Sequence, residues 1–175
     1  CRKAACEPGE TLRIEIDSSL GRHQVSFTAT AAGLHRLRVT TRFTPATAMR
    51  IPFLPRDLYP LGRGDDPLRA RGNVEAAQRG VNAGLVYLRL DEPTFGSALY
   101  LQNLTALNPY FAATGTKPDG VVGGEWPELG YRAPTPDSGE GDNGGQIEGG
   151  QELVLSDAVL VLRDWAGDNE QEMAR

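Results

Sequence analysis

Apolar and polar residues alternate along the N-terminal third of the chain, which is the pattern of β-strands that turn one face toward a core. The alternation covers three segments, at residues 11–17, 24–30 and 35–43. In the first segment Leu12, Ile14 and Ile16 share one face, opposite charged residues, so we expect this strand to be half-buried. Because short turns separate the segments, the pattern predicts three antiparallel strands joined as a meander.

The remainder of the chain combines further strands with stretches rich in proline and glycine. Strands are predicted at residues 74–80, at 84–91 paired with 97–103, and, as one or two buried strands, at 152–163. The proline-rich stretch at residues 44–72 is too apolar for a free linker, so it predicts a long ordered loop. Residues 104–111 have room for one helical turn, and Pro109 is expected to end any regular structure there.

These elements predict a mostly β fold, an antiparallel two-sheet β-sandwich with long loops rich in proline and glycine and little helix. The 21 glycines and 12 prolines favour many turns and few long helices. We expect one domain at residues 11–164, after a disordered N-terminus at residues 1–10. Within the domain, residues 135–151 predict a flexible, acidic, glycine-rich loop, and residues 165–175 predict the start of a helix.

The charge and cysteine content exclude several classes of function. A net charge of −5 and a pI near 5.1 provide no general attraction to nucleic acid. No apolar run approaches the roughly 20 residues of a membrane-spanning helix, so no membrane contact is expected. Cys1 and Cys6 lie together at the N-terminus and cannot supply a four-cysteine zinc site. Few cysteines and the lack of a visible leader favour the cytoplasm.

The segment at residues 115–136 holds the residues best suited to bind a ligand. It displays Glu125, Trp126, Glu128 and Tyr131 on what we expect to be an extended loop. Proteins recognise sugars with aromatic faces that stack on C–H surfaces and with carboxylates or amides that hydrogen-bond hydroxyl groups. The segment therefore predicts a binding site for an oligosaccharide or polysaccharide. The alternative is that Trp126 and Tyr131 fasten the loop to the sheet, since large aromatic side chains are more often buried.

A second polar and aromatic group lies just before this segment. Asn108 and Tyr110 are assigned to the predicted substrate-binding site together with the residues above. The alternative role of Asn108 is local, because an Asn-Pro pair commonly begins a turn.

A row of arginines lies on one face of the third predicted strand. Arg36, Arg38 and Arg42 alternate with apolar residues and are placed to receive an acidic ligand or partner. The simpler interpretation is a solvated sheet face on which carboxylates of neighbouring strands balance the positive charges.

No catalytic residue, metal ligand or cofactor site is predicted, and the chain by itself is expected to be non-catalytic. His23 and His35 lie on different strands and form no evident triad or zinc pair. A three-residue spacing of Glu125 and Glu128 does not set the separation of about 5–10 Å that glycosidases need. The acidic stretch does not have the spacing of a calcium loop, and no glycine-rich phosphate loop is present.

Three blocks resemble the N-terminal region of large bacterial glycoside-hydrolase-like proteins. The blocks are FLPRDLYPLG at residues 53–62, the run at residues 76–108, and GTKPDGVVGGEWPELGYRAPTP at residues 115–136. In these proteins a β-sandwich precedes an (α/α)6 barrel, as in glucoamylase-like and disaccharide-phosphorylase-like enzymes. The resemblance covers about residues 11–164 and rests on the general character of the sequence, without a catalytic motif.

The resemblance implies a non-catalytic β-sandwich domain of a glycoside hydrolase or phosphorylase. In such enzymes the catalytic acids lie on the barrel, which would be this domain's partner. It also implies that residues 115–136 reach over the sugar site and that residues 165–175 begin the linker helix. Two alternatives remain open: a free-standing carbohydrate-binding module, and a structural or protein-docking domain without glycan contact, which would use the apolar stretch at residues 51–61.

Overall fold

The computed structural model describes most of the expected domain. It covers residues 9–29, 36–50, 54–61, 68, 70–78, 84–91, 97–118, 121–134 and 146–163. Residues 1–8 of the expected disordered N-terminus lie outside these residues, as do residues 135–145 of the expected acidic loop and the helix expected at 165–175.

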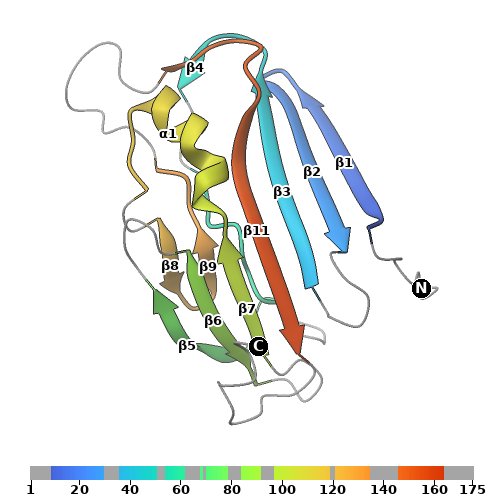
Figure 1. Cartoon of the computed structure of the whole chain (residues 1–175), viewed down its shortest axis with the longest axis vertical. Coiled ribbons are helices and arrows are strands. Elements are labelled where there is room, and N and C mark those ends of the chain that lie inside the picture. The colour runs from blue at the N-terminus through green and yellow to red at the C-terminus, as the bar shows by residue number, and fades with distance from the viewer. Residues whose placement is uncertain are drawn as a thin grey trace.

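The fold is mostly β and is built on one large antiparallel sheet (Figure 1). The sheet has seven strands in the order β1-β2-β3-β11-β7-β6-β5. In this order the strands are β1 (Thr11–Ser18), β2 (Gly21–Ala29), β3 (Arg36–Pro45), β11 (Leu153–Arg163), β7 (Ser97–Gln102), β6 (Leu85–Leu90) and β5 (Gly72–Gln78). The last strand of the chain, β11, therefore lies between β3 and β7 and joins the N-terminal and middle parts of the chain.

The strands predicted from alternation are present. β1, β2 and β3 pair in chain order without a register shift, which confirms the predicted meander. The expected pairing of residues 84–91 with 97–103 is confirmed by β6 and β7. Residues 153–163 form a single strand, whose register with β3 shifts between Val154 and Ser156.

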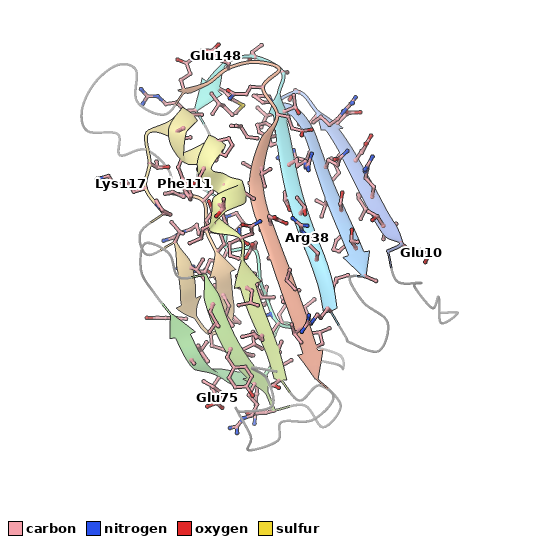
Figure 2. The ribbon with its side chains drawn as sticks, in the orientation of Figure 1. Glu10, Arg38, Glu75, Phe111, Lys117 and Glu148 are labelled. Atoms are coloured by element: carbon pink, nitrogen blue, oxygen red, sulfur yellow. The ribbon has the colours of Figure 1, made fainter. Side chains whose placement is uncertain are left out.

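A second, smaller layer packs on one face of the sheet. It consists of the ribbon β8 (Val122–Glu125) and β9 (Glu128–Tyr131), residues 54–60 beside β9, the 3-10 helix η2 (Leu104–Leu107), the helix α1 (Asn108–Thr114), and the ribbon β4 (Met49–Arg50) and β10 (Gln146–Ile147). Helix α1 packs against β11 and brings Tyr110 and Phe111 into the core. Phe111 is labelled on this helix in Figure 2. The core between the layers includes Phe43, Val86, Tyr100, Leu107, Tyr110, Phe111, Val122, Tyr131, Ile147, Leu153 and Leu155. Among the described residues, the strands of this layer form only two-stranded ribbons and no full second sheet.

Three local expectations differ from the structure. Pro109 does not end regular structure but lies in the first turn of α1, where its missing N–H has no helical partner to lose. Residues 115–136 are not one extended loop, because β8 and β9 form a hairpin within them. Residues 146–147 of the expected acidic loop form β10, and Ile147 is fully buried.

The two halves of the sheet differ in how well they are covered. Val86 and Leu88 of β6 are 0% and 2% exposed, whereas every residue of β1 is exposed. Leu12, Ile14 and Ile16 are 61%, 43% and 54% exposed, so the expectation that this row is half-buried is wrong. The alternation identified the strand correctly, but the elements that cover β6 do not extend across to β1 (Figure 1).

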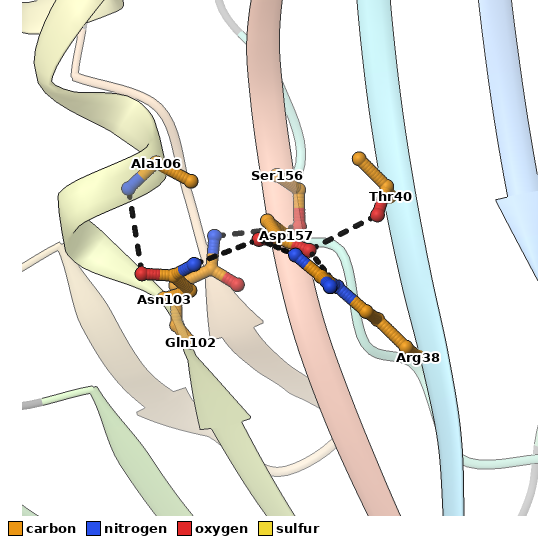
Figure 3. Close-up of polar contacts among 7 residues, drawn as sticks. All are labelled: Arg38, Thr40, Gln102, Asn103, Ala106, Ser156 and Asp157. Carbon is orange, nitrogen blue, oxygen red and sulfur yellow. Dashed lines mark hydrogen bonds and ion pairs between the residues drawn. The ribbon is translucent and has the colours of Figure 1, made fainter. Parts of the chain in front are cut away.

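A buried carboxylate fastens the central strand β11 to its neighbours on both sides (Figure 3). Asp157, which is 2% exposed, accepts hydrogen bonds from Nε and Nη2 of Arg38, both at 2.7 Å. It also accepts from Thr40 Oγ1 at 3.0 Å and from Asn103 Nδ2 at 2.9 Å. Burial opposes ionisation of this carboxyl, but these hydrogen bonds outweigh it and lower the pKa of Asp157. Arg38 belongs to the arginine row, and Arg42 of the same row pairs with Glu152, so facing carboxylates balance this strand as expected.

We expect Asp157→Asn to lower the free energy of unfolding by about 2 kcal/mol at neutral pH, because it leaves the Arg38 donors without their anionic acceptor. Since the folded-state pKa is lowered, the wild-type advantage is present above the ordinary value of 3.8 and is lost as the pH falls through the folded-state pKa. Urea unfolding of both proteins at neutral pH and well below pH 3.8 measures this.

A matched control is Asp17→Asn, which breaks an ion pair with Arg22 in which both side chains are exposed. This substitution should change stability little at either pH, because water screens exposed pairs. Equal losses in the two variants would contradict the special role of Asp157.

Candidate functional site

An open pocket of about 610 Å³ lies at the β8–β9 turn. Its lining residues are Arg56, Val122, Gly124, Glu125, Trp126, Pro127 and Glu128. Three of the residues predicted from the sequence, Glu125, Trp126 and Glu128, therefore meet at one pocket. They do so because Glu125 and Glu128 are directly opposite each other in the hairpin, with Trp126 and Pro127 forming the turn between them.

Arg56 holds the hairpin from the segment that runs beside β9. Its Nη1 donates to Gly130 O at 2.8 Å and to Val121 O at 3.3 Å. Gly124 makes this contact possible, since a Cβ there would lie 2.9 Å from Cδ and Nε of Arg56 and its φ of +111° disfavours other residues. A fixed guanidinium thus forms part of the pocket wall.

Asp57, the next residue, ties the hairpin to the main sheet. Its Oδ1 accepts from the backbone N–H of Tyr131 at 2.8 Å. Its Oδ2 accepts from the hydroxyl of Tyr100 on β7 at 2.8 Å and from the hydroxyl of Ser156 on β11 at 2.5 Å. Asp57 as a residue reaches the surface, but both carboxylate oxygens bind groups of the core. Desolvation raises the pKa of Asp57, and the three hydrogen bonds oppose that rise only in part.

Trp126 has a structural role as well as a place in the pocket wall. Its Nε1 donates to Ala70 O at 3.0 Å, and its half-buried ring packs on the small cluster of Leu88, Ala98 and Leu129. A Cβ at Gly72 would lie 2.6 Å from Cη2 of Trp126, so the ring occupies space that only glycine leaves free. One side of the ring is therefore used for packing, which leaves only part of it for a ligand.

The other predicted residues lie away from the pocket lining. Tyr131 is 2% exposed and Tyr110 is 0% exposed, so neither ring is available to stack on a sugar. Tyr110 donates its hydroxyl to Pro134 O at 2.7 Å, and burial raises its pKa to about 12. Asn108 is exposed at the start of α1. The packing thus shows that Tyr131 fastens this segment to the sheet, and that Trp126 does so with one side of its ring.

The pocket can bind a polar ligand but offers no recognised catalytic arrangement. Directly opposite residues of an antiparallel pair project from the same side of the ribbon, with Cβ atoms about 5 Å apart. Glu125 and Glu128 therefore face a ligand from one side, whereas glycosidases place two carboxyl groups on either side of the scissile bond. Within the described part of the chain, no group of three His, Cys, Asp or Glu side chains is placed to hold a metal ion.

Sequence reasoning missed Arg56 and Asp57, which hold the pocket in place. The available signal was a charged pair, Arg-Asp, enclosed by the prolines and leucines of residues 54–60. A charged pair inside an apolar segment must find partners when that segment packs. Its partners lie on β7, β9 and β11, far away in the sequence, so the pattern alone could not identify them.

Comparisons with known proteins provide no assignment for this site. No family model, no curated protein and no solved structure matches the chain. None of the described helices has the length and apolar character needed to cross a membrane.

We expect two tyrosines of this region to respond in opposite ways to removal of their hydroxyl. Among the described residues, the buried Tyr131 Oη has no hydrogen-bond partner, so Tyr131→Phe should leave the free energy of unfolding unchanged or raise it by about 1 kcal/mol. Tyr100→Phe removes a donor to Asp57 and should lower the free energy of unfolding by about 1–2 kcal/mol. Urea denaturation distinguishes the two, and the reverse order would show that Asp57 does not depend on Tyr100.

Proposed function

We propose that this chain is a non-catalytic β-sandwich module of a carbohydrate-active enzyme of the glycoside-hydrolase-like kind, and that its β8–β9 pocket meets the oligosaccharide. The observation that carries the proposal is the pocket itself, in which Glu125 and Glu128 stand with Arg56 and the ring of Trp126 around one open space. Carboxylates and a guanidinium supply acceptors and donors for neighbouring hydroxyl groups, and the indole supplies an apolar edge.

The module shapes a sugar site and leaves the chemistry to another domain. The one-sided placement of Glu125 and Glu128 suits the binding of hydroxyl groups better than cleavage of a glycosidic bond. In this proposal the catalytic acids belong to an (α/α)6 barrel of the same protein, a glycoside hydrolase or phosphorylase. The proposal assigns the place of the second sandwich sheet to the ribbons β8–β9 and β4–β10, which are two separate two-stranded sheets. It also assigns the chain to the cytoplasm, which the low cysteine content favours.

A second function, a docking domain without glycan contact, is favoured by a different observation. The apolar row Leu12, Ile14 and Ile16 is exposed on the strand β1. Exposed apolar patches commonly mark interaction surfaces, so this row favours a docking function. The expected docking stretch at 51–61 lies partly outside the described residues, and residues 54–60 of it pack beside β9. A free-standing carbohydrate-binding module uses the same pocket as the proposed accessory module and differs only in acting without a barrel.

The proposal is tested by titrating the chain with a panel of α- and β-linked gluco-oligosaccharides in a calorimeter. Glu125→Gln and Glu128→Gln should each weaken binding by roughly 10-fold, because each removes charge-assisted hydrogen bonds while keeping the side-chain shape. Both positions are exposed, so the fold should tolerate the changes. Trp126→Ala is a poorer test, since it also removes core packing.

Glu148→Gln serves as the control, because Glu148 is an exposed carboxylate that does not line the pocket. It should bind every oligosaccharide as the wild type does. No binding of any sugar by the wild type, or equal binding by all variants, would favour the docking domain over both carbohydrate-binding functions.

A further inference from the structure

The two edges of the seven-stranded sheet are protected to different degrees. At one edge, β5 carries a register irregularity between Val74 and Ala76, and it is contacted by β8 of the second layer. Bulges and covering elements are the usual means by which proteins prevent an edge strand from pairing with another chain. At the other edge, β1 pairs with β2 along residues 11–18 without irregularity, and no described strand pairs with its outer side. Figure 2 shows the β1 side chains standing at this open margin of the sheet.

The outer edge of β1 presents unpaired backbone groups from its odd-numbered residues. In an antiparallel ladder, alternate residues direct both their N–H and C=O toward the same neighbouring strand. Ala29 N donates to Glu10 O at 3.3 Å, which places the even-numbered positions on the side of β2. Arg13 and Glu15 therefore direct their N–H and C=O groups away from the sheet, toward any strand that adds to it.

The charge pattern of β1 is complementary to itself in one antiparallel register. If Ile14 lies opposite Ile14 of a second copy, Arg13 of each copy lies opposite Glu15 of the other, and Leu12 lies opposite Ile16. A shift of two residues in one direction places Arg13 opposite Arg13. A shift of two residues in the other direction places Glu15 opposite Glu15, and there Arg13 lies opposite Asp17, a carboxylate that already pairs with Arg22 of its own chain. Like charges directly opposite each other are destabilising and unlike charges stabilise, so the sequence selects the register centred on Ile14.

This register also suits the backbone and the apolar row. It places Arg13 opposite Glu15 as hydrogen-bonded pairs, which uses the outward N–H and C=O groups of both copies. Residues opposite each other share a face, so the aliphatic rows of the two copies become continuous, and Leu12, Ile14 and Ile16 gain neighbours on their open side. Arg13 lies opposite neutral Ser26 on β2, so the strand beside it within the chain does not compensate its charge.

We propose that a second copy of this chain pairs with the outer edge of β1, strand antiparallel to strand about a two-fold axis at Ile14, so that one sheet continues across both copies. The interface is isologous, because the same strand is used by both partners. The pairing adds a strand to an exposed sheet edge, a recurring mode of protein recognition. It is independent of the sugar pocket, which lies at the β8–β9 turn.

The test is a charge-reversal series on the full chain, with the molar mass measured by sedimentation equilibrium. The wild type should form a dimer. Arg13→Glu and Glu15→Arg should each raise the dissociation constant by roughly 30-fold, since two attractive pairs become repulsive. The double variant Arg13→Glu with Glu15→Arg should restore it, because each pair is again of opposite charge. The control Arg36→Glu changes an exposed arginine on β3, away from the edge, and should dimerise as the wild type does.

Cross-linking tests the register directly. In a background with Cys1→Ser and Cys6→Ser, Ile14→Cys should form a disulfide-linked dimer, because opposite residues of a non-hydrogen-bonded pair have Cα atoms about 4.5 Å apart. Leu12→Cys, an exposed position on the same face, should not cross-link, because it lies opposite Ile16 of the second copy.

Three outcomes would overturn the proposal. A wild-type chain that stays monomeric at every concentration has no such interface. A dimer that is indifferent to both charge reversals uses the apolar face or another surface, since Arg13 and Glu15 lie on the opposite face of β1 from Leu12. Failure of the double variant to restore the dimer, with circular dichroism showing a folded chain, excludes the register centred on Ile14.

Discussion

The carboxylate of Asp57 joins the two layers of the molecule, and the arrangement of the pocket depends on it. It holds the backbone of Tyr131 in the hairpin and the hydroxyls of Tyr100 and Ser156 on two strands of the main sheet. Gly130 leaves the space for this contact, since a Cβ there would collide with Oδ1 of Asp57. Desolvation raises the pKa of Asp57, which shows that the site partly disfavours the charge that its hydrogen bonds stabilise. The three hydrogen bonds of Asp57 therefore fix the position of the hairpin on the main sheet.

A second carboxylate, Asp157, has the same function within the sheet. It connects β11 to β3 through Arg38 and Thr40 and to the end of β7 through Asn103 (Figure 3). The two carboxylates lie on opposite faces of β11, since Ser156 contacts Asp57 and Asp157 is the next residue. The central strand is thus the element through which the covered half and the open half of the sheet are joined. The pocket lies on the covered side, and the open edge lies at the far end of the other half.

Alternation along the chain predicted the strands because a pleated strand places successive side chains on opposite faces. β1, β2, β3, β6 and β7 follow that rule. β1, β2 and β3 pair in chain order, as do β6 and β7, and pairing between consecutive strands is the commonest arrangement. The sequence pattern did not predict the hairpin β8–β9, because Gly123 and Gly124 interrupt the alternation of apolar and polar residues. Leu129 is also buried by residues that are distant in the sequence, such as Leu88 and Ala98. The prediction for Pro109 was wrong because proline disrupts a helix only when it lies in the interior. In the first turn, where Pro109 lies, proline is well accommodated. The candidate site was predicted in part, since Glu125, Trp126 and Glu128 line the pocket whereas Tyr110 and Tyr131 are core residues.

The sequence by itself determined that this chain is a mostly β protein with a net negative charge, because strand periodicity and charge are local properties of the residues. Only the tertiary structure decided which apolar rows are covered. Leu12, Ile14 and Ile16 alternate as cleanly as any buried strand, yet they are exposed because the second layer does not extend over them. Only the tertiary structure decided the role of Trp126 as well, because Gly72 and Ala70, more than fifty residues earlier in the chain, supply the space and the carbonyl that hold its ring. Burial and hydrogen bonding depend on neighbours that are distant in the chain, and no local pattern identifies such neighbours.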